Sequence, residues 1–124
     1  MDYRVEALTP QLAQTFVSFF EQLDFGHAPH WSICFCRWYY NDCPVEEWYS
    51  RSASQNRAEA LAAIQAGHMP GYLAFDGDQC IGWCNAVDIR KLPRLSPYVK
   101  ELQPDKKIGC VICFAVHQDY RGQG

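Results

Sequence analysis

The stretch from Ile108 to His117 limits what this chain can fold into, because both of its alternating sets of side chains are apolar or small up to Val116. Successive side chains of a β-strand point to opposite faces of the sheet. A strand that is apolar on both faces is typical of a sheet interior, where other layers cover each face. The chain is therefore expected to be an α/β (α+β) protein built around this strand.

Two helices are predicted before the main strands. Thr9 and Pro10 are typical of a helix start, because threonine can cap the first turn and proline lacks the N–H that this turn leaves unpaired. The second helix is expected to be capped by Asn56 together with Glu59 and to stop at Gly67. Apolar residues recur at helical spacing in both segments.

A β-hairpin is predicted after the second helix. Residues 72–75 and 80–87 read as strands, and Asp76-Gly77-Asp78 between them is a turn sequence. The segment from His27 to Ser54 is irregular and rich in aromatic residues, and within it residues 32–38 could form a strand. A long irregular segment in a compact domain is often a binding loop.

Composition excludes several classes of protein. The 124 residues fit a single domain (1–124), and 48% of them are hydrophobic, which is enough for a core. The net charge of −3, without a block of like charge, argues against nucleic acid as a partner. No apolar run is long enough to span a membrane, and the first residues do not resemble a signal peptide. A cytoplasmic location is the default expectation.

The seven cysteines are interpreted as reduced, buried core residues. Their number is odd and no secretion signal accompanies them, so a disulfide scaffold is not expected. Zinc is the competing hypothesis, and its possible ligands are close in sequence but irregularly spaced. They are His27, His30, Cys34, Cys36 and Cys43. Cys110 and Cys113 cannot chelate one ion from a strand, since residues three apart face opposite sides. No metal is predicted.

The predicted strand runs into the glycine-rich sequence Tyr120-Arg121-Gly122-Gln123-Gly124. Glycines let backbone N–H groups approach the oxygens of a phosphate. This sequence resembles the pyrophosphate-binding motif of GNAT-superfamily N-acetyltransferases, Arg/Gln-x-x-Gly-x-Gly/Ala, whose first four positions match residues 121–124. Further strings resemble one GNAT subgroup, among them residues 31–36, 70–75, 81–84 and 111–114. The resemblance implies a GNAT-like, mostly antiparallel sheet with two N-terminal helices, and residues 1–124 would be the N-terminal portion of one such domain.

The resemblance also implies a site and a reaction. Acetyl-CoA would be the co-substrate, and a primary amine of a small molecule or peptide would attack its thioester directly in a ternary complex. The implied cofactor-binding residues are Phe114, Ala115 and Val116 for the acetyl and pantetheine part and Arg121, Gly122, Gln123 and Gly124 for the pyrophosphate. His117 is a weak candidate for the catalytic base, since free histidine has a suitable pKa. Direct transfer needs no nucleophile, so Cys113 is not expected to act as one.

The sequence stops within the motif, and three expectations follow from that. The 124 residues alone are expected to bind acetyl-CoA weakly and to be inactive. The exposed last strand is expected to recruit a second copy of the chain, giving a homodimer. The alternative function is a non-catalytic binding or interaction domain that keeps a GNAT half-fold.

Overall fold

The computed structural model describes residues 2–102 and 105–123, with the side chains of residues 100–102 left aside. Its main sheet has four strands in the order β1-β2-β3-β6, and all neighbours are antiparallel. The strands are β1 (Tyr3–Ala7), β2 (Gly71–Asp76), β3 (Gln79–Asn85) and β6 (Phe114–Val116). The predicted hairpin is β2 and β3, and Gly77 in its turn has the positive φ of +59° that glycine adopts easily.

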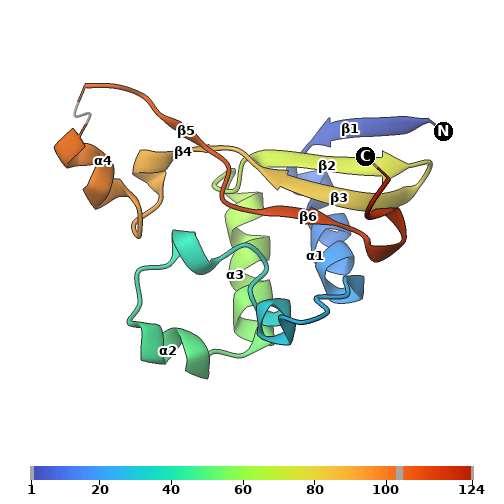
Figure 1. Ribbon diagram of the computed structural model, residues 1–124, viewed down its shortest axis with the longest axis horizontal. Coiled ribbons are helices and arrows are strands. Elements are labelled where there is room, and N and C mark those ends of the chain that lie inside the picture. The colour runs from blue at the N-terminus through green and yellow to red at the C-terminus, as the bar shows by residue number, and fades with distance from the viewer. Residues whose placement is uncertain (1, 103–104, 124) are drawn as a thin grey trace.

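Two helices, α1 (Ala13–Gln22) and α3 (Ala53–Gln65), cover one face of this sheet, as Figure 1 shows. Their apolar residues pack on the strands that lie above them. Phe16 of α1 meets Trp83 of β3 edge to face, with ring centroids 4.9 Å apart. Neither helix, nor any other helix in the described part of the chain, is long and apolar enough to cross a membrane.

The start of each helix differs in part from the prediction. A 3-10 turn (Pro10–Leu12) precedes α1, and Pro10 stands at its first position as expected, but the Thr9 side chain makes no capping hydrogen bond. The capping box of α3 is formed by Ser52 and Gln55, so the prediction that Asn56 and Glu59 form it was wrong. Those two residues instead make long-range contacts, which a local motif cannot reveal.

The contacts of Asn56 and Glu59 attach α3 to the aromatic-rich segment. Asn56 is fully buried, donates to the Ile33 carbonyl at 2.8 Å, and accepts from Arg51 Nε at 2.8 Å. Glu59 pairs with Arg51 and lies 3.8 Å from Arg37 Nε. One face of α3 thus contacts the irregular segment at Ile33, Arg37 and Arg51.

The prediction of a strand at residues 32–38 was wrong. The segment forms the 3-10 turns Pro29–Ile33 and Trp38–Tyr40 and then the short helix α2 (Val45–Ser50). Phe35 and Cys36 have φ of 48° and 60°, in the left-handed region, and both side chains are buried. An extended strand cannot contain two such residues, and core burial is what holds them there.

The prediction of one continuous strand from Ile108 to His117 was also wrong. The structure divides it into β5 (Gly109–Cys110), which pairs with β4 (Val87–Asp88), and β6, which pairs with β3. The neighbouring segment is interrupted as well, since β3 ends at Asn85 and β4 begins at Val87. The two parts of Ile108 to His117 therefore pair with two different strands. A helix, α4 (Ser96–Leu102), lies beside this second small sheet (Figure 1).

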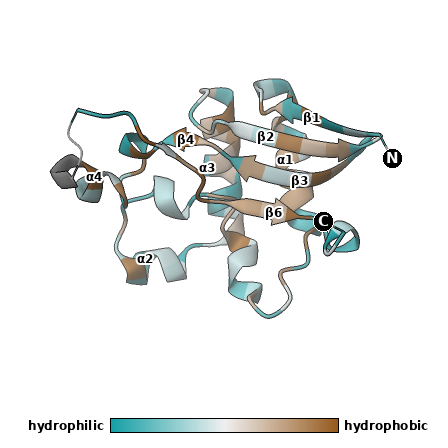
Figure 2. Cartoon of the chain, turned by 45° about the horizontal axis from the view of Figure 1, so that its top comes forward, coloured by the Kyte–Doolittle hydropathy of each residue, from teal (hydrophilic) through white to brown (hydrophobic). Residues whose placement is uncertain are grey.

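The last strand is not covered on both faces as predicted. Val111 is 59% exposed and Phe114 is 74% exposed. Figure 2 shows β6 as a hydrophobic strand at the border of the sheet, where β3 is its neighbour. The fold class is nevertheless the expected one, an antiparallel sheet with helices on one face.

Candidate functional site

The free edge of β6 presents two backbone amides. His117 N–H donates to the Ile81 carbonyl at 2.8 Å, and Asn85 N–H donates to the Cys113 carbonyl at 3.0 Å. Ala115 lies between these pairs, opposite Trp83. In an antiparallel ladder hydrogen-bonded pairs alternate, so the odd residues of β6 point their backbone groups at β3. The N–H groups of Phe114 and Val116 therefore point away from β3, toward the open edge.

A short turn follows β6 and is fastened to the helical layer. It is the 3-10 turn Gln118–Tyr120. The Gln118 side chain donates to the carbonyl of Gln22, the last residue of α1, at 3.3 Å. It also accepts from the N–H of Asp24, two residues further on, at 3.1 Å. These bonds hold the start of the glycine-rich loop at the end of the sheet.

Arg121 extends this attachment. Its Nε donates to the Val116 carbonyl at 2.8 Å and its Nη2 to the Asp24 carbonyl at 2.7 Å. The Arg121 side chain thus binds the Val116 carbonyl, which faces away from β3, and leaves the N–H of Val116 pointing outward. A cation is held beside a candidate phosphate-binding loop without being buried, since Arg121 is exposed.

Gly122, at a variable position of the motif, has a backbone conformation that glycine adopts easily. Its φ is +74°, and a Cβ placed there would meet no atom within 4 Å. The constraint on this glycine is therefore backbone conformation and not space. Gln123 donates to the Asp119 carbonyl at 3.2 Å and closes the turn. Gly124, the last predicted loop residue, lies outside the described residues.

His117 acts as a cap for the same turn. Its Nδ1 accepts from the N–H of Asp119 at 3.2 Å, and the residue is only 8% exposed. Its ring stacks edge to face with Tyr120 at 5.9 Å between centroids. His117 therefore stabilises the turn that follows β6.

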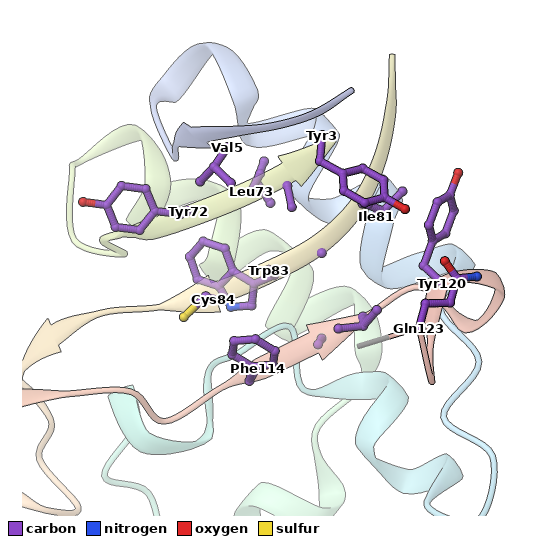
Figure 3. Close-up of a pocket in the computed structure, with 14 residues that line it drawn as sticks. Tyr3, Val5, Tyr72, Leu73, Ile81, Trp83, Cys84, Phe114, Tyr120 and Gln123 are labelled. Atoms are coloured by element: carbon purple, nitrogen blue, oxygen red, sulfur yellow. The ribbon is translucent and has the colours of Figure 1, made fainter. Parts of the chain in front are cut away.

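A shallow groove of about 470 Å³ lies on the sheet face opposite α1 and α3 (Figure 3). One row of paired residues crosses all four strands here: Val5, Ala74, Gly82 and Val116. The small side chains in the middle of this row make the floor. The predicted residues Phe114, Ala115 and Val116 all line it, together with Gln123 of the loop.

Aromatic residues stand at both ends of this groove. Tyr72 and Phe114 flank Cys84 at one end, and both are exposed. Tyr3 and Tyr120 stand at the other end, 6.4 Å apart between ring centroids (Figure 3). No role was predicted for these tyrosines. Tyr3 and Val5 in β1, and Tyr72 and Ala74 in β2, are each two residues apart, and this spacing could have indicated a second apolar face.

Tyr120 also connects the loop to the hairpin. Its hydroxyl donates to Asp76 Oδ2 at 2.6 Å, and this hydrogen bond to the carboxylate raises the pKa of Tyr120 to about 12. The hydroxyl is thus a donor over the whole physiological range of pH. The contact places the loop beside the end of β2.

The cysteines are all free thiols in the structure. Cys36 lies in the core and Cys113 packs against the same cluster, so the two thiols interact there. That contact raises the pKa of Cys36 and lowers the pKa of Cys113. Within residues 2–102 and 105–123, no three histidine, cysteine or acidic side chains gather in a way that could hold a metal ion.

An antiparallel sheet with helices on one face, ending in a strand with an open edge and a glycine turn, defines an α+β class of protein. A sequence model of the acetyltransferase (GNAT) family matches residues 27–124. The match covers most of the chain, and the chain belongs to the GNAT acetyltransferase family.

A solved structure has the same fold. It is an aminoglycoside acetyltransferase from an uncultured soil metagenomic sample, with 14% sequence identity and a TM-score of 0.54. The superposition covers 100% of this chain and 64% of that one, so the chain spans less than two thirds of that protein's length. Among curated proteins, none matches the sequence significantly.

Proposed function

We propose that this chain forms the acetyl-CoA-facing part of an N-acetyltransferase that transfers an acetyl group to a primary amine. The observation that carries the proposal is the open edge of β6, where the N–H groups of Phe114 and Val116 point outward, with the short turn Gln118–Tyr120 between this strand and Gly122. Family membership supports acetyl transfer in general.

In the proposed reaction the amine attacks the thioester carbonyl directly, without a covalent enzyme intermediate. The carbon–nitrogen bond forms as the carbon–sulfur bond breaks. The amine gives up one proton, and the departing thiolate takes one up, so that coenzyme A leaves as the thiol. Backbone amides at a fixed strand edge stabilise the charge that develops on the thioester oxygen, because they need no reorganisation during the reaction. We assign this role to the amides of Phe114 and Val116.

In this proposal the glycine-rich loop binds the pyrophosphate of acetyl-CoA. The amides of Gly122 and Gln123 would hold the pyrophosphate, with the cation of Arg121 beside them. The backbone N–H of Arg121 is not part of this set, since it donates to the Gln118 carbonyl at 3.4 Å. The positive φ of Gly122 supports this assignment, because backbone turns can point N–H groups at a bound anion. Gly124 belongs to the same loop in the family motif.

A proline substitution tests the amide assignment. Val116→Pro removes an N–H that points to solvent and no ladder bond, and edge strands tolerate proline in this orientation. The variant should keep its fold by circular dichroism and lose about three- to tenfold in acetyl-CoA affinity by calorimetry, since one hydrogen bond to the bound cofactor is lost. Val5→Pro, on the opposite edge strand, is the control. Unchanged affinity in Val116→Pro would refute the assignment.

The open edge of β6 also supports a partner of another kind. An unpaired strand edge next to an exposed phenylalanine favours pairing with a second copy of the chain. This homodimer would use the same amides as the cofactor, so the two are expected to compete. Light scattering across a concentration series should show dimers that acetyl-CoA dissociates; dimers insensitive to acetyl-CoA would separate the two surfaces.

A further inference from the structure

A second cavity, of about 390 Å³, lies at the other end of the sheet from the glycine loop. It opens beside Pro70, just before β2, whereas Tyr120 of the loop contacts Asp76 at the far end of β2. Its lining comes from the aromatic-rich segment, from the turn after α3 and from the 3-10 turn Ile89–Lys91. We call it the basic pocket, and its lining residues are Arg37, Tyr40, Ala63, Gly67, His68, Pro70 and Lys91.

The charges that line the basic pocket are all positive. Arg37 and Lys91 are cations, His68 becomes one when protonated, and the lining contains no aspartate or glutamate. The acidic group nearest Arg37 is Glu59, 3.8 Å from its Nε, and Glu59 also neutralises Arg51. One carboxylate thus serves two guanidinium groups, and the pocket keeps an excess of positive charge.

Burial of the positive charge of Arg37 costs free energy unless an anion lies close to it. Desolvation lowers the pKa of Arg37, although the guanidinium remains charged at any physiological pH. Its Nε is inaccessible to solvent and faces Glu59 Oε2 at 3.8 Å, so an anion in the pocket would meet the rest of the guanidinium. A ligand oxyanion in the pocket would offset this cost, because partly buried charges gain most from a close counter-ion.

The Tyr40 hydroxyl supplies a directed donor. Asn85 is fully buried, and its side-chain amide donates both to Tyr40 Oη at 2.6 Å and to the Pro70 carbonyl at 3.3 Å. The Pro70 carbonyl can only accept, so it fixes which end of the Asn85 amide is NH₂. Tyr40 Oη therefore accepts from Asn85 and keeps its own proton for an acceptor in the pocket. Burial raises the pKa of Tyr40 to about 12, so this proton is present at neutral pH.

Asn85 also connects the basic pocket to the candidate acetyl site. Its backbone N–H donates to the Cys113 carbonyl at 3.0 Å, directly before Phe114. We propose that the basic pocket binds an anionic group, a carboxylate or a phosphate, of the acyl acceptor. As far as it concerns the acceptor, this inference rests on the proposed function. Such a position would leave the amine of the acceptor free to reach the open edge of β6.

Anion binding can be measured without acetyl-CoA. Inorganic phosphate is titrated into the ¹⁵N-labelled protein at constant ionic strength, and amide shifts are followed by NMR. The shifts should concentrate at Arg37, Tyr40, His68 and Lys91. Affinity should fall by about three- to tenfold in Lys91→Met and in Tyr40→Phe, each of which removes one donor. It should be unchanged in Lys107→Met, which removes a charge that is exposed like that of Lys91 but lies outside the pocket. Equal weakening in Lys107→Met, or none in the two pocket variants, would overturn the inference.

Matched amines then identify the source of the anion. Glycine is compared with glycinamide, and phosphoethanolamine with ethanolamine, so that each pair differs in the anionic group. At least one anionic amine should bind about tenfold more tightly than its neutral partner, and the pair that does so distinguishes carboxylate from phosphate. Equal binding within both pairs would refute an acceptor subsite.

The two proposals fail separately. Phosphate binding at the basic pocket in a protein that does not bind acetyl-CoA would count against the proposed function and support the anion site. Acetyl-CoA binding without any anion binding at the pocket would sink only the inference drawn from Arg37, Tyr40 and Lys91.

Discussion

The two faces of the main sheet are built from the same strands and are used in opposite ways. On the inner face, Leu73 and Trp83 are buried against Phe16 of α1. On the outer face, the neighbouring residues Tyr72 and Phe114 stay exposed around the groove. Alternation along each strand sends adjacent residues to different faces. Neighbours in sequence should therefore differ sharply in what they contribute, stability on one face and ligand contact on the other.

The largest expected difference is between Leu73 and Tyr72. Leu73 is fully buried, so Leu73→Ala should lower the free energy of unfolding by about 2–5 kcal/mol through lost transfer energy and a cavity. Tyr72 is 49% exposed, so Tyr72→Ala should cost less than about 1 kcal/mol. Urea denaturation of the two variants measures both. Similar costs would mean that the outer face is covered in solution.

Two strand glycines provide the next test. A Cβ at Gly71 would lie 2.3 Å from the Trp83 ring and 2.5 Å from the Cys84 carbonyl oxygen, so Gly71→Ala should destabilise by about 1–3 kcal/mol. A Cβ at Gly82 would point into the outer groove, 3.4 Å from the Ala115 carbonyl and 3.5 Å from Ala74 Cβ. Gly82→Ala should be neutral or stabilising by up to about 1 kcal/mol, because it reduces the entropy of the unfolded chain. Thermal melts distinguish the two; a Gly82→Ala loss as large as that of Gly71→Ala would show the groove floor to be packed.

A smaller effect is expected where the loop fastens the open edge to the helical layer. Arg121→Met removes the hydrogen bonds to the Val116 and Asp24 carbonyls and should speed amide exchange in residues 118–121 by about tenfold, while the global stability falls by no more than about 1 kcal/mol. Hydrogen exchange by NMR measures the change. Lys107→Met is the charge-matched control, and equal exchange in both variants would mean that Arg121 does not anchor the loop.

The smallest effect is a titration on the outer face. The pKa of Tyr120 is raised to about 12 by its bond to Asp76, above the ordinary value near 10. The stabilisation from this bond is fully present below pH about 10 and is lost as pH rises through about 12. Asp76→Asn should move one tyrosinate absorbance transition down toward 10 and leave that of Tyr40 near 12, since burial raises the latter. An unchanged alkaline absorbance curve in Asp76→Asn would contradict the hydrogen bond between Tyr120 and Asp76.

Local patterns in the sequence predicted much of the frame. The hairpin around Gly77, the stop of α3 near Gly67 and the glycine turn at Gly122 were all visible, because each depends on residues next to one another and on positive φ. The fold class and the family were predicted as well. The roles of Phe114, Ala115 and Val116 in binding acetyl-CoA stay predictions.

Contacts between distant residues decided the rest. Phe35 and Cys36 are left-handed where a strand was expected, and Asn56 binds Ile33 instead of capping a helix, because burial in the shared core outweighs local preference. The basic pocket could not be predicted either, since Arg37, His68 and Lys91 meet only after folding. The sequence by itself determined the elements whose hydrogen bonds are local; the tertiary structure decided which strand edge stays open and which charges gather, because both depend on the packing of segments far apart in the chain.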